Sequence, residues 1–497
     1  MHKRVSIYIV IISGLLTGLS QQPIYSGWLA WFSFVPLIFV LNQVQTKGLS
    51  FMLGFLWGVS YFLLTIFWLA MNIGTTPFVG FISMVIAVLY CSLNSALFCL
   101  IIYLFKTYHN FYWIWLMPFV WTAIEYIRNM DVLTGGPWTS IANTQVYFHT
   151  LIQNVEIFGI YGISFWIILI NVAIYNWLDK PYTKHALLII PCFILPWISG
   201  YYLTPNHNSN SNSSDRLSIS LVQPNIHLFD KRKTNNNRKL IENIINLSKP
   251  EIADSVDLIV WPESALPTYI LQSNQLYINL IQSSLNNSKL LTGLPYYIND
   301  DNSRKKFNSA VLVSENDISE IYNKLVLVPV GEYIPLSTHF PSLSDINLGQ
   351  ANFTAGDKFV LFNVNDYVIA SMICFESTIP SLSSKFVMSG AEVLVYLVND
   401  GWYEHPPEPQ QHAKQSIFRA IENNTFVVRS ANKGISAFIN NNGKVIKRLE
   451  PDEVGNIELN VPLIDNNIGN KNDLIFFILL FTYLIIFLIF KNKKHAK

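Results

Sequence analysis

The sequence predicts a multispan α-helical membrane bundle of about eight spans, joined to an α/β domain outside the cytoplasm. Of its 497 residues, 51% are hydrophobic and 13% are charged, which is too apolar for an ordinary soluble protein of this length. Long uncharged apolar runs recur through the first 203 residues and once more near the end. Between them lies a polar stretch in which short β-rich runs alternate with helix-like segments.

Eight segments are expected as spans, because a bilayer core needs roughly 20 apolar residues in a helix. The clearest is the uncharged run 51–70. For the first segment a cleaved signal peptide is the alternative, since "HKR" precedes a short apolar stretch, although no clear small-x-small cleavage site follows. The expected spans are 5–19, 28–41, 51–70, 78–105, 111–127, 157–178, 186–203 and 474–490.

The charges at the two ends predict the orientation. An even number of spans places both ends on one side, and the short basic ends "MHKR" and "KNKKHAK" are typical of the cytoplasm. Lys47, Lys106, Lys180 and Lys184 then fall on the inner side, and Arg128 is the main exception. We therefore expect a transmembrane bundle over 1–203, a linker over 204–216, an extracytoplasmic catalytic domain over 217–471 and a C-terminal transmembrane helix with a basic tail over 472–497.

The net charge excludes one class of partner. With 33 basic and 32 acidic residues, the formal charge of +1 provides no general field for nucleic acid, so no nucleic-acid partner is expected.

Cys374 is the only thiol expected in the extracytoplasmic domain, because Cys91, Cys99 and Cys192 all fall within expected spans. An unpaired thiol in an oxidising compartment is a chemical liability. A small buried core residue is the alternative, since cysteine is often one. The surroundings of the thiol have to decide between the two.

A nucleophilic thiol needs a base to take its proton and positive or hydrogen-bonding groups to receive the oxyanion. Glu263 stands just after an apolar strand in "VWPESALP". Lys324 precedes a second strand-like run in "KLVLVPVGEY", and Glu332 closes that run. Each alone is more commonly a surface residue.

Taken together, a glutamate in "WPES", a lysine before "LVPVGEY" and a cysteine in "ICFES" resemble the nitrilase, or carbon-nitrogen hydrolase, superfamily. The membrane segments "EYIRNMDVLTGGPW" and "QNVEIFGIYGISFWIILINVAI" resemble its membrane-anchored branch, the apolipoprotein N-acyltransferases. The chain departs from the family pattern at Val326, Val330 and Phe375, where His, Phe and Tyr are common. The resemblance implies a nitrilase-like αββα sandwich for the extracytoplasmic domain.

The resemblance also implies a catalytic triad. Glu263 is expected as the general base and Cys374 as the nucleophile. Lys324 and the backbone N–H of Phe375 are expected to stabilise the oxyanion.

Further residues are expected to support the site or bind substrate. Glu332 and Glu376 would orient the lysine and the site, with ordinary salt bridges as the alternative. Phe340 lies in the long segment 331–356, a candidate lid or membrane-dipping arm, or else a covered surface loop. Trp402 would contact the lipid substrate or simply pack.

Three polar or aromatic residues of the membrane half are also candidates. Glu125 and Arg128 are three apart and share one face of a helix, either for function or as an interfacial ion pair. Trp138 would line the path of the lipid.

No metal is expected, because His405 and His412 bracket a proline-rich loop without a third ligand spaced with them.

The reaction that the resemblance implies has two steps and needs no cofactor. Cys374 would take a fatty acyl chain from a membrane phospholipid as a thioester and pass it to the α-amino group of a diacylglyceryl-cysteine at the N-terminus of an apolipoprotein. The enzyme would lie in the bacterial inner membrane with its catalytic domain on the periplasmic side. Alternatives are a membrane-tethered amidase that uses water, a transporter with an extracytoplasmic binding domain, and a structural scaffold.

Overall fold

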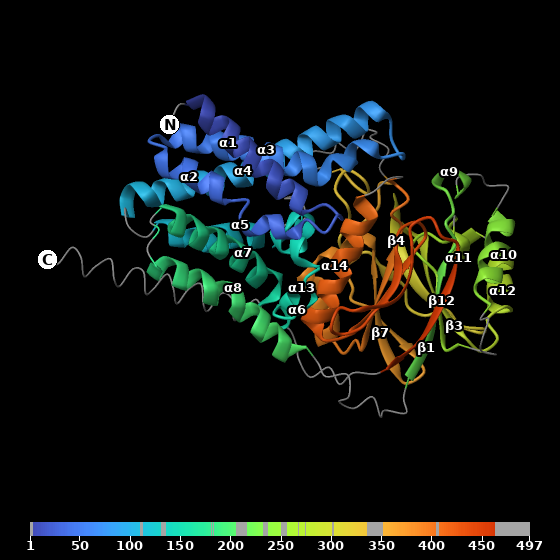
Figure 1. The fold of residues 1–497 in the computed structure, drawn as a ribbon. Helices are drawn as coiled ribbons and strands as arrows, with labels where there is room; N and C mark the ends of the chain where they lie inside the picture. Colours follow the sequence, from blue (N-terminus) through green and yellow to red (C-terminus); the bar gives the residue numbers. More distant parts are fainter. Residues whose placement is uncertain are drawn as a thin grey trace. The chain divides into compact units, whose positions relative to one another are not determined.

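The computed structural model describes two compact units of the chain, each taken here by itself (Figure 1). A helical unit contains the described residues up to 66 and from 86 to 204. An α/β unit contains residues 67–85 and the described residues from 216 to 462. The residues described are 3–109, 113–130, 136–179, 181, 183–204, 216–231, 237–249, 256–266, 268–273, 275–300, 303–334, 351–403 and 407–462.

The helical unit consists of apolar helices joined by short 3-10 turns. Its hydrophobic side chains form a core in which tryptophans meet edge to face, as Trp57 and Trp121 do at a ring distance of 5.7 Å. The main helices are α1 (Lys3–Ser20), α2 (Val35–Gln43), α3 (Lys47–Ile66), α4 (Pro77–His109), α5 (Met117–Met130), α7 (Val155–Asp179) and α8 (Thr183–Leu203).

Three of the described helical segments are long and apolar enough to cross a membrane: 47–71, 77–108 and 155–179. Segments 4–20, 27–43 and 189–203 are apolar but shorter. The expected second span is interrupted, because a 3-10 turn over Gly27–Trp31 precedes α2. The expected eighth span, 474–490, lies outside the described residues.

Glu125 is buried and anchors α5. Its carboxylate accepts hydrogen bonds from Trp121 Nε1 at 3.0 Å and from the Ile141 backbone N–H at 2.8 Å. The hydroxyls of Ser140 and Ser164 donate to its second oxygen at 2.9 and 2.6 Å. A buried carboxylate without hydrogen-bond donors is energetically costly in apolar surroundings. The donors found here therefore indicate that Glu125 connects neighbouring segments of the helical unit and does not face water.

The α/β unit contains two six-stranded sheets. Each has a parallel centre, formed by β1, β2 and β3 in the first and by β7, β8 and β9 in the second, with antiparallel strands outside. The first sheet has the order β12 (Gly455–Pro462), β1 (Arg216–Gln223), β2 (Leu258–Val260), β3 (Lys289–Asp300), β4 (Ser303–Val313), β5 (Tyr322–Asn323). The second has the order β11 (Val445–Leu449), β10 (Ser436–Ile439), β9 (Phe426–Ala431), β8 (Val393–Val398), β7 (Tyr367–Ile373), β6 (Leu361–Val364).

Helices cover the outer face of each sheet (Figure 1). Helices α10 (Asn237–Leu247) and α12 (Gln275–Gln282) pack on the first sheet through Ile244 and Ile278, and α13 (Pro380–Met388) and α14 (Glu408–Asn423) lie on the second. Residues of both sheets share one core, in which Leu221 and Val395 are fully buried. The α/β character predicted for this part of the chain is confirmed, and its layers are helix, sheet, sheet, helix.

The last residues of segment 47–71, which is long and apolar enough to cross a membrane, belong to the α/β unit. The α-helix stops at Ile66 and continues as a 3-10 turn over Phe67–Met71. The indole N–H of Trp68 donates to Gln411 Oε1 at 3.0 Å, and the Ile73 N–H donates to the Trp402 carbonyl at 3.0 Å. Hydropathy cannot separate this turn from the helix, because its residues are equally apolar.

Candidate active site

The three residues predicted to carry the reaction each follow a strand. Glu263 lies in the turn after β2, and Lys324 directly follows β5, so both come from the first sheet. Cys374 directly follows β7 of the second sheet. Both Glu263 and Lys324 act electrostatically on the Cys374 thiol, so the fold brings the three side chains into one site.

Cys374 sits at a sharp turn from strand to helix. Its φ is 52°, in the left-handed region, where a non-glycine residue costs about 1–3 kcal/mol unless its surroundings enforce it. Here the Ile373 N–H donates to Glu376 Oε2 at 2.8 Å, and Ser377 Oγ donates to the Cys374 carbonyl oxygen at 2.8 Å. The turn therefore presents the thiol at the strand end, the arrangement that nucleophiles on strained strand-to-helix turns use.

Glu263 is held at the end of β2 by a close passage of backbone. A Cβ at Gly293 would lie 2.7 Å from the Glu263 Cα, so glycine is needed where β3 passes this turn. The Asn308 amide donates to Glu263 Oε1 at 2.7 Å. Burial raises the pKa of Glu263 above its ordinary value, against the opposing effect of Lys324. A carboxylate with a raised pKa is a stronger base than an exposed one.

Lys324 is 1% exposed and is paired with Glu332. Its Nζ lies 2.9 and 2.8 Å from the two oxygens of Glu332, which also accepts from the Val328 N–H at 2.8 Å and from Asn308 at 3.0 Å. Burial lowers the pKa of Lys324, but Glu332 and Glu263 raise it by more, so the ammonium stays charged. Lys324 is thus a fixed positive charge beside the thiol.

Burial raises the pKa of the Cys374 thiol well above its ordinary value. The Glu263 carboxylate raises it further, and the Lys324 ammonium lowers it. The thiol therefore rests in its protonated form and needs a base that removes the proton as the sulfur attacks. The Glu263 carboxylate, which acts on the thiol electrostatically, is the base that the sequence predicts for this step.

Glu376 ties the two sheets together at the site. Its Oε1 accepts from the backbone N–H groups of Leu325 and Val326 at 2.7 and 3.0 Å, and its Oε2 accepts from Ile373. The Tyr322 hydroxyl lies 2.9 Å from both oxygens. Burial raises the pKa of Glu376 to about 7, against the lowering effect of Lys324. These contacts indicate that Glu376 links the segment after β5, which carries Lys324, to the turn that carries Cys374.

Two family models match the chain, one over its N-terminal apolar part and one over its α/β part. Residues 13–173 match the apolipoprotein N-acyltransferase N-terminal domain, and residues 218–465 match the carbon-nitrogen hydrolase family. An apolipoprotein N-acyltransferase of Rickettsia bellii is 30% identical over 96% of this chain and 97% of its own length. The chain belongs to the apolipoprotein N-acyltransferase family.

Other relatives with the same name agree over nearly the whole length. The protein of Rickettsia prowazekii is 29% identical over 96% of this chain and 98% of its own. That of Geobacter metallireducens is 29% identical over 88% of this chain and 85% of its own. The resemblance found in the sequence is confirmed, and the chain is a membrane acyltransferase with a nitrilase-like domain.

Sequence reasoning missed several residues that complete the site. Asn308 bonds to both Glu263 and Glu332, yet it stands in strand β4 with no motif around it. Asp400 bonds to His412 Nδ1 at 2.7 Å and to Arg429 Nη2 at 2.9 Å. Spatial proximity alone identifies these partners, because they are common residue types spread over the chain.

The sequence places His412 near only one other potential metal ligand of its type, His405, which lies outside the described residues. The structure groups it differently. One ligand atom from each of Cys374, Asp400 and His412 lies within 4.8 Å of the others. Within this grouping Asp400 bonds to His412, and it also bonds to Arg429.

The predicted substrate contacts are only partly described. Trp402 is half-buried, and its ring packs on Gly74, where an added Cβ would meet it at 2.6 Å. Trp138 is half-buried in a 3-10 turn over Gly136–Thr139. Phe340 lies outside the described residues, as do positions 335–350 of the expected arm.

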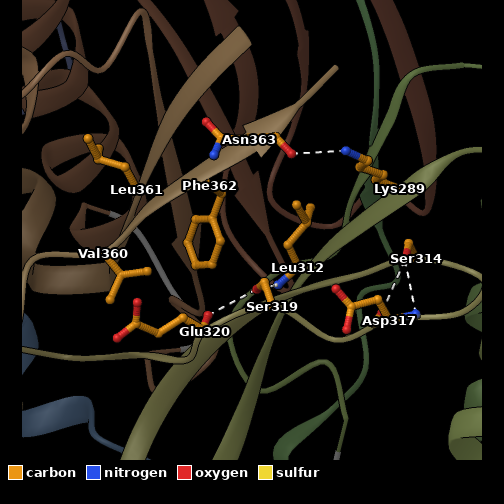
Figure 2. A pocket seen from close by; sticks show the side chains of 10 residues that line it. All are labelled: Lys289, Leu312, Ser314, Asp317, Ser319, Glu320, Val360, Leu361, Phe362 and Asn363. Atoms are coloured by element: carbon orange, nitrogen blue, oxygen red, sulfur yellow. Dashed lines mark hydrogen bonds between the residues drawn. The ribbon is translucent and has the colours of Figure 1, made fainter. Parts of the chain in front are cut away.

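A hollow of about 270 Å³ lies elsewhere in the α/β unit (Figure 2). Strand β6 and the end of β4 line it, and Lys289 Nζ donates to the Asn363 carbonyl at 3.0 Å within it. None of the predicted site residues that the structure describes lines this hollow, so it does not mark the predicted active site.

Proposed function

We propose that this chain transfers a fatty acyl chain from a membrane phospholipid, through a thioester on Cys374, to the α-amino group of the diacylglyceryl-cysteine of apolipoproteins. The observation that carries the proposal is the half-buried Cys374 thiol, whose pKa Glu263 raises and Lys324 lowers, in a chain of this family. We assign Glu263, Lys324 and Cys374 as its catalytic triad.

The first half-reaction forms the acyl-enzyme. Glu263 takes the thiol proton as the Cys374 sulfur attacks the ester carbonyl carbon, and the negative charge moves to the carbonyl oxygen. The Lys324 ammonium and the Phe375 N–H stabilise that oxyanion. The C–O bond then breaks, and Glu263 returns the proton to the leaving lysophospholipid.

The second half-reaction consumes the thioester. The free amine of the apolipoprotein attacks the carbonyl carbon and Glu263 accepts the amine proton; the C–S bond then breaks as Glu263 passes this proton to the Cys374 sulfur. A thioester suits this order because it is more reactive toward amines than an oxygen ester. Glu332 keeps the Lys324 charge in place through both steps, and the reaction needs no metal or organic cofactor.

The membrane helices would hold both lipid-bearing substrates in one plane, which raises their effective concentration. We propose eight spans with both termini in the cytoplasm and the catalytic domain on the periplasmic side of the inner membrane. Trp138, Phe340 and Trp402 are the proposed lipid contacts.

The proposed orientation can be tested with reporter fusions. A cytoplasmic reporter should be active after Lys497 and inactive at Asn210. The reverse pattern would contradict the orientation.

Acceptor chemistry distinguishes this function from that of a tethered amidase. The purified enzyme is incubated with phospholipid and a diacylglyceryl-cysteine peptide, either with a free or with a blocked N-terminus. The proposal predicts an N-acylated product from the free peptide only. Release of free fatty acid at equal rates with both peptides would show that water is the acceptor.

A further inference from the structure

The peptide group between Cys374 and Phe375 is held at its carbonyl oxygen. Its N–H is the proposed backbone donor to the oxyanion, and its carbonyl oxygen belongs to Cys374. Ser377 Oγ donates to this oxygen at 2.8 Å, and His412 Nε2 lies 3.2 Å from it. His412 Nε2 also lies 3.0 Å from Ser377 Oγ, so one imidazole and one hydroxyl meet at this oxygen.

A buried chain of side chains fixes the imidazole. His412 Nδ1 bonds to Asp400 Oδ1 at 2.7 Å, and the second oxygen of Asp400 pairs with Arg429 Nη2 at 2.9 Å. His412, Asp400 and Arg429 are 1%, 3% and 0% exposed. They belong to α14, to the turn after β8 and to β9. Three separate elements therefore hold His412 Nε2 next to the turn at Cys374.

The His412 ring can hydrogen-bond to the turn at Cys374 in both of its protonation states. Carboxylate and carbonyl oxygens only accept, so a protonated ring donates from Nδ1 to Asp400 and from Nε2 to the Cys374 carbonyl. A neutral ring keeps its proton on Nδ1, and its Nε2 then shares the Ser377 hydroxyl proton with the Cys374 carbonyl oxygen, so Ser377 remains the donor to that oxygen. Burial lowers the pKa of His412, and so does Arg429, whereas Asp400 raises it. Glu408 Oε1 also faces the ring, 3.9 Å from Nδ1.

We propose that His412, together with Ser377, is a positioning residue for the oxyanion site. Donors on the carbonyl oxygen fix the plane of the Cys374–Phe375 peptide group and draw electrons toward that oxygen. The N–H at the other end of the same group then points reliably at the oxyanion and donates more strongly. This inference rests on the proposed function, because it assumes that Cys374 forms an acyl intermediate.

Two reactions of the same thiol separate this role from a general structural one. With p-nitrophenyl butyrate, the sulfur forms a bond to the carbonyl carbon through an oxyanion, and p-nitrophenolate leaves. With iodoacetamide, the sulfur displaces iodide directly and no oxyanion forms. Because both reactions need the deprotonated thiol, the ratio of their rate constants reports on the oxyanion site alone.

The test uses the full-length protein in detergent, with the variants His412→Gln and Ser377→Ala. Losing a whole oxyanion donor costs about 100- to 1000-fold, so weakening one should lower the acylation rate constant by about tenfold in each variant. Alkylation should stay within about twofold of the wild-type rate. The matched control is Ser283→Ala, an exposed serine after α12, which should leave the ratio unchanged.

A ratio in His412→Gln equal to that of the wild type would overturn the inference, whether both rates persist or both fall together. If His412→Gln does not fold, Ser377→Ala decides the question by the same ratio. The activated ester needs no lipid recognition, so the inference can fail while phospholipid still acylates the enzyme. A wild-type enzyme that reacts with the activated ester but not with phospholipid would instead contradict the proposed function.

Discussion

The two sheets of the α/β unit contribute different things to the site. The first sheet supplies Glu263 and Lys324, whose side chains are held by other side chains, mainly Glu332 and Asn308. The second sheet supplies Cys374, which is held by its backbone in a left-handed turn. Substitutions in the first sheet should therefore alter proton transfer and the charge near the thiol without unfolding the protein. Substitutions in the second sheet should alter the position of the Cys374 thiol.

The largest effect is expected from Cys374→Ala in the second sheet. Removing the proposed nucleophile should lower acyl transfer by at least about a thousandfold, since the thioester is proposed to form on its sulfur. The matched control replaces Cys91, Cys99 and Cys192 with alanine and should keep most activity. The measurement is the rate of N-acylation of a diacylglyceryl-cysteine peptide.

Glu263→Gln in the first sheet should come next. The amide is nearly isosteric, so the thermal unfolding midpoint should change little, but it cannot accept the thiol proton. Acylation should fall by about 100- to 10,000-fold, and alkylation by iodoacetamide should slow as well. A variant that acylates at the wild-type rate would remove Glu263 from the role of base.

Glu376, where the sheets meet, should give a smaller and pH-dependent effect. Burial raises the pKa of Glu376 to about 7, so the folded protein binds this proton more tightly than the unfolded chain. The resulting stability is complete below about pH 4.5 and is lost as the pH rises through 7. The wild type should therefore exceed Glu376→Gln in unfolding midpoint by more at pH 5 than at pH 8. Equal differences at both pH values would contradict the raised pKa.

In both sheets, the sequence predicted the residues that stand in motifs but not the side chains that hydrogen-bond to the site. Glu263, Lys324 and Cys374 stand in short motifs directly after strands, so local pattern and family resemblance located them. Asn308 has no such motif, and the stretch "NDGWY" around Asp400 resembles the family without giving Asp400 a role; only the pairing of strands distant in sequence brings the two to the site. Hydropathy predicted the apolar segments, but not that α3 stops at Ile66, because equally apolar residues continue as a turn that bonds to the α/β unit.

The smallest effect is expected from Trp68→Phe, outside both sheets. The change keeps a ring but removes the N–H that donates to Gln411, at a cost of about 0.5–1.5 kcal/mol. The thermal unfolding midpoint should fall by about 2–4 °C. Trp177→Phe, at an exposed tryptophan of α7, should not change it. Equal midpoints for the two variants would show that the Trp68 bond contributes nothing.

The thioester on Cys374 is the central claim and can be observed directly. The enzyme is incubated with phospholipid alone, digested and analysed by mass spectrometry. The account predicts a fatty acyl group on the peptide that carries Cys374, removed by hydroxylamine and discharged by a diacylglyceryl-cysteine peptide with a free amine. A Cys374→Ala enzyme that still acylates that amine would contradict the mechanism and return Cys374 to the role of a core residue.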